Sequence, residues 1–401
     1  SAHLSFSARL MRSTLETMVR RTGQAHVFAP TCVELRLRQS ISTMITSDWE
    51  GTYQELRQAT RALADCNASA RPRLELQVLD ALARTAYRRR DATALRNIIL
   101  SIRALNAPVN AAITADLWDA MALNLDGQAA AARAALQKVC LQTDAPTITI
   151  HAWHYLGELS LQMNLPRSTQ EVLQNALKRA TALQTQPHAP YTKRLLNLVC
   201  ADILRTTAEF HGKKASNGDA QARTQQERLL LQALEICRQE GDLQGESRLY
   251  TLLTRMWRQA LFWAKDNGQP MDPQMLEHAQ RCWARLSALT NAMDDRRGLA
   301  LLEWEAGGLA ELIQDFEAAT GHYLKAQAHF EALGERFNAA AALNTLGEVA
   351  AQQGLHQQAL DHFKAHRETM KQLKDERHEA PTRQPTAPTP RALPPHTPRP
   401  G

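Results

Sequence analysis

A small residue followed four positions later by an aromatic residue recurs in the second half of the chain, at intervals of 40 residues. The three occurrences are Ala279 with Trp283, Ala319 with Tyr323, and Ala359 with Phe363. Self-similarity at a fixed period indicates a repeat architecture, in which each unit packs against its neighbours. A small side chain at such a position allows two helices to cross closely. The spacing therefore predicts a stack of helical units and favours it over a globular bundle.

The composition points to the same fold class. Of the 401 residues, 64 are alanine and 55 are leucine, and both are strong helix formers. Aromatic residues make up 5% of the chain, whereas a β-sandwich or barrel would need more aromatic and β-branched residues. A chain of this length fits an elongated array, because an array adds core repeat by repeat. We expect an all-α fold.

Residues 340–366 form the clearest unit. Its first helix carries small and apolar residues on one face, a glycine marks its turn, and its second helix faces back. The residues concerned are Leu343, Leu346, Gly347 and Ala350, then Gly354, then Ala359 and Phe363. This spacing resembles the tetratricopeptide repeat (TPR). The resemblance covers about residues 31–375 and implies an α-solenoid, a right-handed superhelix of TPR-like helix pairs. Units near 40 residues are similar to the tandem TPRs of kinesin light chains and of bacterial signalling and regulatory proteins.

The upstream units repeat this pattern at a more variable spacing. Polar linkers at 241–246 and 334–339 each stop one helix and start the next, and polar segments at 211–222 and 266–272 are predicted as loops between the two helices of a pair. The best upstream unit contains Trp153, Leu156, Gly157, Leu173 and Ala176.

Three segments follow from these patterns. We expect an N-terminal amphipathic helix or cap at 1–30, the TPR-like helical array at 31–377, and a disordered Pro-rich tail at 378–401. Eight of the 21 residues from Pro381 onward are proline, and such a stretch buries too little apolar surface to order itself. The last helix before the tail resembles the exit helix that leads from TPR sensor arrays into an output module. The chain therefore either works without an output domain or is a fragment.

The charge balance does not favour nucleic acid as a partner. The net charge is +6, and half of this excess lies in residues 381–401. A nucleic-acid binder would show a concentrated basic face. The one dense basic run, Arg88-Arg89-Arg90, is followed at once by Asp91. We interpret it as the end of a helix, where cations suit the macrodipole.

Cysteine usage and hydropathy predict a cytoplasmic protein without a membrane partner. The six cysteines lie 34 or more residues apart, which fits neither a zinc site nor a disulfide scaffold. We predict that they are small core residues in a reducing compartment. No apolar run approaches the roughly 18 to 20 residues of a membrane span.

Motifs that carry chemistry are missing from the sequence. There is no GxxxxGK[ST] phosphate loop, GxGxxG, HExxH or GxSxG sequence. His362 and His366 stand four residues apart and could hold a metal with His356 or Glu368, but we interpret them as solvated surface residues. We therefore predict no metal, no cofactor and no catalytic residue.

The resemblance to TPRs also implies where a ligand would bind. In a TPR superhelix the first helix of each repeat lines the concave surface, at offsets 2, 5, 9 and 12 along that helix. The matching positions are His154, Glu158, Arg194, Asn197, Thr251, Arg255, Arg258, Asn344 and Glu348. Asparagine can hold an extended peptide through its backbone, and arginine can clamp a carboxylate. The middle of the groove is mildly basic and suits an acidic peptide, although each position is also compatible with a plain solvated residue.

The leading hypothesis is a non-enzymatic scaffold that binds a peptide or protein segment in its concave groove, within a bacterial regulatory or signalling pathway. A second hypothesis is a ligand-sensing regulatory array, similar to those of diguanylate cyclases or LuxR-type regulators, which lacks its output domain. A third is an enzyme with an unrecognised site. TPR positions specify helix packing and leave the ligand and the oligomeric state open.

Overall fold

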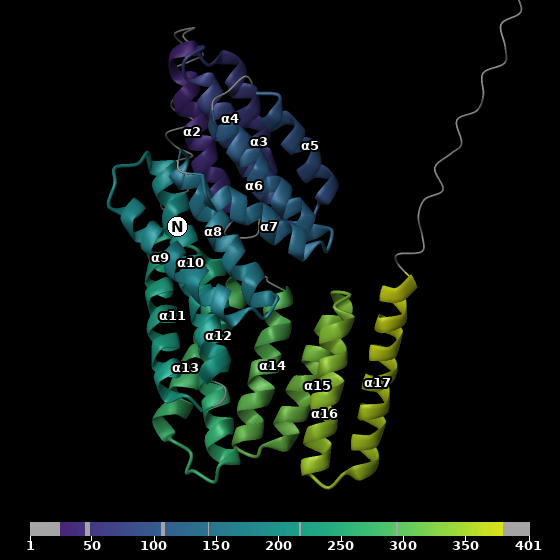
Figure 1. Cartoon of the computed structure of the whole chain (residues 1–401). Coiled ribbons are helices and arrows are strands. Elements are labelled where there is room, and N and C mark those ends of the chain that lie inside the picture. Colours follow the sequence, from purple (N-terminus) through teal and green to yellow (C-terminus); the bar gives the residue numbers. More distant parts are fainter. Residues whose placement is uncertain are drawn as a thin grey trace, which may run out of the picture. The chain divides into compact units, whose positions relative to one another are not determined.

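The described chain is made of helices. The computed structural model describes residues 25–44, 49–105, 109–142, 144–215, 218–293 and 296–379. Within these ranges the backbone forms sixteen α-helices, one short 3-10 helix and no strand (Figure 1). The expectation of an all-α solenoid is confirmed. The chain divides into two compact units, Ser1–Gly298 and Leu299–Gly401.

The first unit consists of consecutive helix pairs. The first helices of its pairs are α2 (Ala25–Met44), α4 (Arg71–Arg88), α6 (Val109–Leu125), α8 (Pro146–Gln162), α10 (Pro190–Ala215) and α12 (Leu243–Asp266). The second helices are α3 (Trp49–Ala62), which the 3-10 helix Leu63–Asp65 follows, α5 (Ala92–Arg103), α7 (Ala129–Cys140), α9 (Pro166–Gln184), α11 (Ala220–Glu240) and α13 (Pro273–Met293). Each of α3, α5, α7, α9 and α11 packs both against its partner and against the first helix of the next pair.

The second unit continues the same pattern with two pairs. Its helices are α14 (Arg296–Leu312), which begins in the last residues of the first unit, α15 (Phe316–Ala332), α16 (Arg336–Gln352) and α17 (His356–Glu379). Helices α15, α16 and α17 lie side by side (Figure 1). Tyr323 and Phe330 are 2% exposed, and both rings make edge contacts with Trp304. These aromatic side chains form the centre of the unit's core.

Glycines let the two helices of a pair approach closely. A Cβ atom added at Gly157 would lie 2.5 Å from Leu173, one at Gly307 would lie 2.7 Å from Tyr323, and one at Gly347 would lie 2.6 Å from Phe363. Real Cβ atoms are not found at such distances, so the helix axes are closer than any larger residue would allow. The predicted role of Gly347 is confirmed. Ala279, Ala319 and Ala359, which recur every 40 residues, are also buried.

Aspartates and left-handed glycines set where the helices begin and end. The side chains of Asp91, Asp219, Asp242 and Asp315 each accept a hydrogen bond from a backbone N–H in the first turn of the following helix, which satisfies a donor that the helix itself leaves free. Gly241 ends α11 with a φ of 68°, and Gly334 follows α15 with a φ of 70°. Both are in the left-handed region that glycine tolerates best. The predicted linkers at these glycines are confirmed.

The first helices of the first unit contact one another. Helix α4 packs on α6, α6 on α8, α8 on α10, and α10 on α12. In addition, α2 contacts α10, where Tyr191 joins the apolar core of α2, α3 and α4. Helices more than 140 residues apart in the chain therefore enclose a common space, lined mainly by α4, α6, α8 and α10.

The structure corrects one of the two predicted loops between paired helices and confirms the other. The predicted loop at 211–222 is wrong for most of its length, because α10 continues to Ala215 and α11 starts at Ala220. Residues in this segment suit helix ends, since Lys213 and Lys214 lie in the last turn of α10 and Asp219 caps α11. The predicted turn at 266–272 is confirmed, because α12 ends at Asp266 and α13 begins at Pro273.

The predicted ends of the chain fall largely outside the described residues. The predicted cap at 1–30 is described only from residue 25 onward, where α2 runs through Pro30 without a break. The Pro-rich tail is described only at residues 378 and 379, the last two of α17. No described helix has the length and hydropathy needed to cross a membrane.

We predict opposite effects for two glycine-to-alanine substitutions in the second unit. Gly321→Ala adds a methyl group that meets no atom within 4 Å and should stabilise the protein by about 0.5–1 kcal/mol, because helix propensity improves. Gly347→Ala has the same propensity gain but forces Phe363 to move, and should destabilise by about 1–2 kcal/mol. Urea unfolding followed by circular dichroism measures both. Equal stability of the two variants would contradict the close approach.

Candidate binding groove

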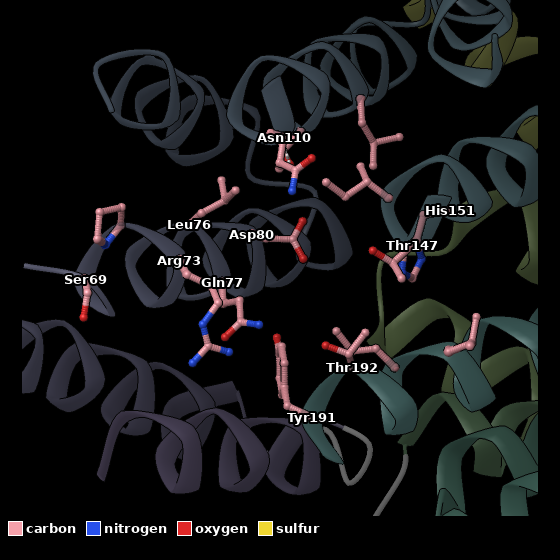
Figure 2. A pocket seen from close by; sticks show the side chains of 16 residues that line it. Ser69, Arg73, Leu76, Gln77, Asp80, Asn110, Thr147, His151, Tyr191 and Thr192 are labelled. Atoms are coloured by element: carbon pink, nitrogen blue, oxygen red, sulfur yellow. Dashed lines mark hydrogen bonds between the residues drawn. The ribbon is translucent and has the colours of Figure 1, made fainter. Parts of the chain in front are cut away.

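A cavity of about 400 Å³ lies among the first helices of the first unit. Its lining side chains reach one space from α4, α6, α8 and α10 (Figure 2). The residues are Ser69, Pro72, Arg73, Leu76, Gln77, Asp80, Asn110, Thr114, Leu117, Thr147, Ile148, His151, Tyr191, Thr192, Leu195 and Leu196. We call this space the first cavity.

Most of the surface that faces the first cavity is apolar, although ten of its sixteen lining residues carry a polar group in the side chain. Leu76, Leu117 and Ile148 supply apolar surface from three helices. Arg73 reaches over to Glu34 of α2, with Nη2 to Oε1 at 3.0 Å. Such a mixture suits an amphipathic group, because apolar walls supply affinity while a few polar groups fix orientation.

A second cavity, of about 210 Å³, adjoins the first and shares His151 and Leu195 with it. It is far more charged, with four arginines and two carboxylates among its lining residues. They are Arg84, Tyr87, Arg88, His151, His154, Tyr155, Glu158, Leu195, Leu198, Val199, Asp202, Arg205, Gln244 and Arg248. We call the first and second cavities together the groove. It extends along α4, α8 and α10 and reaches the start of α12.

A buried guanidinium group stands between the two cavities. Arg84 is 7% exposed, and it donates to Asp80 at 2.9 Å and to Nδ1 of His151 at 3.3 Å. It also lies over the ring of Trp118 at 5.7 Å, while the Trp118 indole N–H donates to the other oxygen of Asp80 at 2.8 Å. Burial alone would lower the pKa of Arg84, but Asp80 outweighs burial and raises it. The guanidinium therefore stays charged, and the Asp80 carboxylate is held by two donors.

The same guanidinium fixes the state of His151. An arginine N–H can only donate, so Nδ1 of His151 accepts and the ring proton of the neutral imidazole is assigned to Nε2. Burial, followed by the charge of Arg84, lowers the pKa of His151 well below its ordinary value. His151 is therefore a neutral donor at the boundary of the two cavities, visible beside Thr147 in Figure 2.

Arg205 is the centre of an ion-pair network in the second cavity. Its guanidinium lies 2.6 Å from Glu158, 3.5 Å from Asp202 and 2.5 Å from Glu209. Burial would raise the pKa of the Glu158 carboxyl, but His154 and Arg205 outweigh burial and hold that pKa below its ordinary range. The pKa of Asp202 is lowered as well, since Arg205 outweighs its burial. Both carboxylates stay ionised at neutral pH, and each nitrogen of the Arg205 guanidinium faces a carboxylate of the protein itself.

Arg88 and Arg248 differ from Arg84 and Arg205. Both line the second cavity, but among the described residues neither makes a hydrogen bond or an ion pair. Arg88 is half-buried, and Arg248 is accessible to solvent within the cavity walls. Desolvation by these walls, followed by the charge of Arg88, lowers the pKa of Arg248. The carboxylates of Asp202 and Asp242 act on Arg248 in the opposite direction, without a hydrogen bond or ion pair to it among the described residues.

A small third cavity, of about 20 Å³, brings the same two arginines together again. Arg88 and Arg248 line it along with Arg205, Asp202 and Asp242. The carboxylate of Asp242 accepts the backbone N–H of Gly245 at 2.8 Å as the cap of α12. Uncommitted positive charge is therefore concentrated where the end of α4 faces the start of α12.

Of the residues that the sequence predicts for the groove, the structure brings two into it. His154 and Glu158 lie one turn apart on α8 and line the second cavity. The His154 Nε2 atom lies 3.5 Å from the Glu158 carboxylate. His154 is buried, whereas the carboxylate of Glu158 is shared with Arg205.

The predicted residues of α10 and α12 lie outside the cavity linings. Arg194 donates to the backbone oxygen of Glu240 at 2.9 Å, and Asn197 donates to the Glu240 side chain at 2.6 Å. Both side chains therefore tie α10 to the end of α11. Thr251 is buried and donates to the backbone oxygen of Ser247. Arg255 also lies on α12, outside the lining residues.

The remaining predicted residues lie elsewhere as well. Arg258 lies over the ring of Phe262 at 5.8 Å. Asn344 and Glu348 belong to α16 of the second unit, where Asn344 donates to Glu348 at 2.7 Å. The proposed roles of these residues in binding a ligand stay predictions.

The sequence pattern predicts Arg88 as a cation at a helix end and does not identify Arg248. Arg88 does occupy the last residue of α4. A signal was present, because Asp80, Arg84 and Arg88 follow one another at intervals of four and therefore share a face of α4. Arg248 stands four residues after Gln244 on α12 in the same way.

The cysteines lie as predicted for core residues, whereas His366 is half-buried and bonded to the backbone, unlike the solvated residue that was expected. Five cysteines are buried and Cys282 is half-buried, all as free thiols, as predicted for core residues. Nδ1 of His366 lies 2.8 Å from the backbone oxygen of Ala340. In the part of the chain that the structure describes, no three His, Cys, Asp or Glu side chains gather as metal ligands would.

Comparison with known proteins identifies the fold. No family model and no curated protein matches the sequence. Aspartyl phosphate phosphatase F from Bacillus subtilis is similar in structure, with 9% identity, a TM-score of 0.50, and coverage of 85% of this chain and 94% of that chain. BtubC from P. vanneervenii has 14% identity, a TM-score of 0.43, and coverage of 69% and 97%. A Rap protein complexed with competence and sporulation factor has 12% identity, a TM-score of 0.41, and coverage of 86% and 99%. The chain is a TPR-like helical repeat protein in its fold.

We predict that Arg205→Met destabilises the protein in a pH-dependent manner. The variant leaves three carboxylates without their guanidinium, and because these carboxylates keep partial exposure we expect a loss of about 2–3 kcal/mol at pH 7. The pKa values of Glu158 and Asp202 are lowered in the folded state. Their stabilisation is therefore complete above about pH 4 and disappears as the pH falls through the lowered values.

The difference in unfolding free energy between wild type and Arg205→Met should accordingly shrink below about pH 4. Urea unfolding of wild type and variant at pH 7 and at pH 3 measures it. Arg281→Met is the matched control, because Arg281 forms an exposed pair with Glu277 and should cost less than about 0.5 kcal/mol. A deficit that stays constant with pH would contradict the ion-pair network.

Proposed function

We propose that the protein is a non-enzymatic scaffold whose groove binds an acidic peptide or protein segment. One observation carries this proposal. A mainly apolar cavity of about 400 Å³ adjoins a cavity lined by four arginines and two carboxylates. A ligand that occupies both would place apolar side chains in the first cavity and acidic groups in the second.

The state of the charged groups supports binding over catalysis. Arg84 and Arg205 are committed to carboxylates of the protein itself. His151 is held neutral, and Glu158 is held ionised. These groups are fixed in one charge state at neutral pH, which suits recognition of a ligand, whereas a general acid or base works best with a pKa near the working pH.

The setting that we propose is regulatory and cytoplasmic. It is supported by the similarity of the repeats to the TPR arrays of bacterial signalling proteins. The size of the first cavity also favours the second hypothesis, a ligand-sensing regulatory array, because small-molecule sites usually measure about 300–1,000 Å³. A sensor of this kind would bind an acidic metabolite in place of a peptide.

Fluorescence anisotropy with three labelled peptides of equal length tests the scaffold. The peptides carry acidic, neutral or basic residues around the same apolar positions. We expect the acidic peptide to bind most tightly and to lose affinity as salt increases. Arg88→Glu combined with Arg248→Glu should weaken its binding by at least about tenfold, because the charge of the second cavity reverses.

The matched control is Arg255→Glu combined with Arg258→Glu, which makes the same charge change on α12 outside the lining residues. The affinity of this control variant for the acidic peptide should equal that of wild type. If this control loses affinity while the first variant does not, the interface lies farther along α12, as the sequence predicted. Stabilisation by a small acidic metabolite in a thermal shift assay, with no binding of any peptide, would favour the sensor instead.

A further inference from the structure

We infer that Arg88 and Arg248 form a subsite for a phosphate monoester, carried by a phosphorylated side chain or by a small organic phosphate. The inference rests on the proposed function where it places this group on the acidic segment bound in the groove. It goes further by naming the chemistry that the uncommitted arginines recognise.

The four arginines of the second cavity differ in their partners. Arg205 is bound to three carboxylates, and Arg84 is bound to Asp80. Arg88 and Arg248 have no hydrogen bond or ion pair among the described residues. Folding therefore pairs two of the four guanidinium groups with carboxylates of the protein, whereas among the described residues Arg88 and Arg248 have no such pair. A guanidinium group binds phosphate through paired N–H donors.

Arg88 and Arg248 together carry two positive charges. Arg88 and Arg248 line both the second and the third cavity. Burial and the charge of Arg88 outweigh Asp202 and Asp242 there, so the charge of Arg248 is disfavoured. One carboxylate would compensate only one of the two arginines. A phosphate monoester carries about −1.5 to −2 charges at neutral pH and three acceptor oxygens, so it compensates both and can accept bonds from both.

A third observation comes from Arg84. Its Nε atom is buried and has no hydrogen-bond partner, although the two terminal nitrogens of the same group are bound to Asp80 and His151. A buried donor without a partner is costly. Because Arg84 lines the second cavity, an anion there would lie next to a third positive group.

The first cavity indicates what the ester is attached to. It shares His151 and Leu195 with the second cavity, and Leu76, Leu117 and Ile148 form part of its walls. A ligand with an apolar body next to its phosphate fits this arrangement. Phenyl phosphate is a minimal probe of that kind, and benzoate is its counterpart with a single negative charge.

Isothermal titration calorimetry of the full chain at pH 7.5 tests the subsite. We expect phenyl phosphate to bind at least about tenfold more tightly than benzoate. Arg88→Ala combined with Arg248→Ala should remove this preference, whereas Arg255→Ala combined with Arg258→Ala should retain it. Equal affinity for both probes, or full affinity in the first variant, would overturn the inference. Neither Arg88 nor Arg248 makes a hydrogen bond to the described residues, and their removal relieves their mutual repulsion. The melting temperature of the first variant should therefore be at least that of wild type, and thermal unfolding verifies this.

A peptide series then separates the inference from the proposed function. Three peptides differ at one position, which holds serine, glutamate or phosphoserine. If the phosphoserine peptide binds most tightly and this preference depends on Arg88 and Arg248, the result supports both the scaffold and the phosphate subsite. It also identifies a phosphorylated side chain as the source of the phosphate. Equal binding of the glutamate and phosphoserine peptides keeps the scaffold and overturns the subsite. Binding of phenyl phosphate without binding of any peptide keeps the subsite, assigns it to a small organic phosphate, and contradicts the scaffold.

Discussion

The close approach of the two helices within a pair is the constraint on which the remaining structure depends. At Gly157, Gly307 and Gly347 no side chain separates the helix from the large residue that faces it. A pair held this closely behaves as one packing element, so its second helix can also pack against the next pair. The first helices then follow one another along the first unit. The groove exists because four of these first helices surround a common space.

The charges in this groove show what folding settles and what it leaves for a ligand. Burying an unpaired guanidinium is expensive, and the chain meets this cost at Arg84 and Arg205 with carboxylates from its own helices. Arg88 and Arg248 stay accessible, so water can solvate them and the fold does not require partners for them. Their cost appears as mutual repulsion in a confined space. A ligand with negative charge is the partner that relieves this repulsion, which is why we place recognition at these two residues.

The sequence predicts the fold well because helix packing has a local signature. Glycine at a crossing point and alanine every 40 residues can be read without knowing any distant contact. The groove is harder to predict. On α8, with 17 residues, the offsets of a standard repeat identify His154 and Glu158. Helices α10 and α12 have 26 and 24 residues, and the residues predicted on them are not among those that line the cavities. The partner of Arg194, Glu240, lies 46 residues away, and no local pattern reveals it.

The boundary between the two cavities suits the ligand with two parts that we propose for the groove. Trp118 and Asp80 orient Arg84, and Arg84 in turn fixes His151 as a neutral group. His151 and Leu195 belong to both linings, so the apolar cavity and the charged one adjoin at these two residues. A purely apolar ligand would leave the arginines unsatisfied, and a lone anion would leave the larger cavity unused. We therefore expect the greatest affinity for a molecule that joins an apolar group to an anion across this boundary, because the entropy of immobilising one molecule is lost only once.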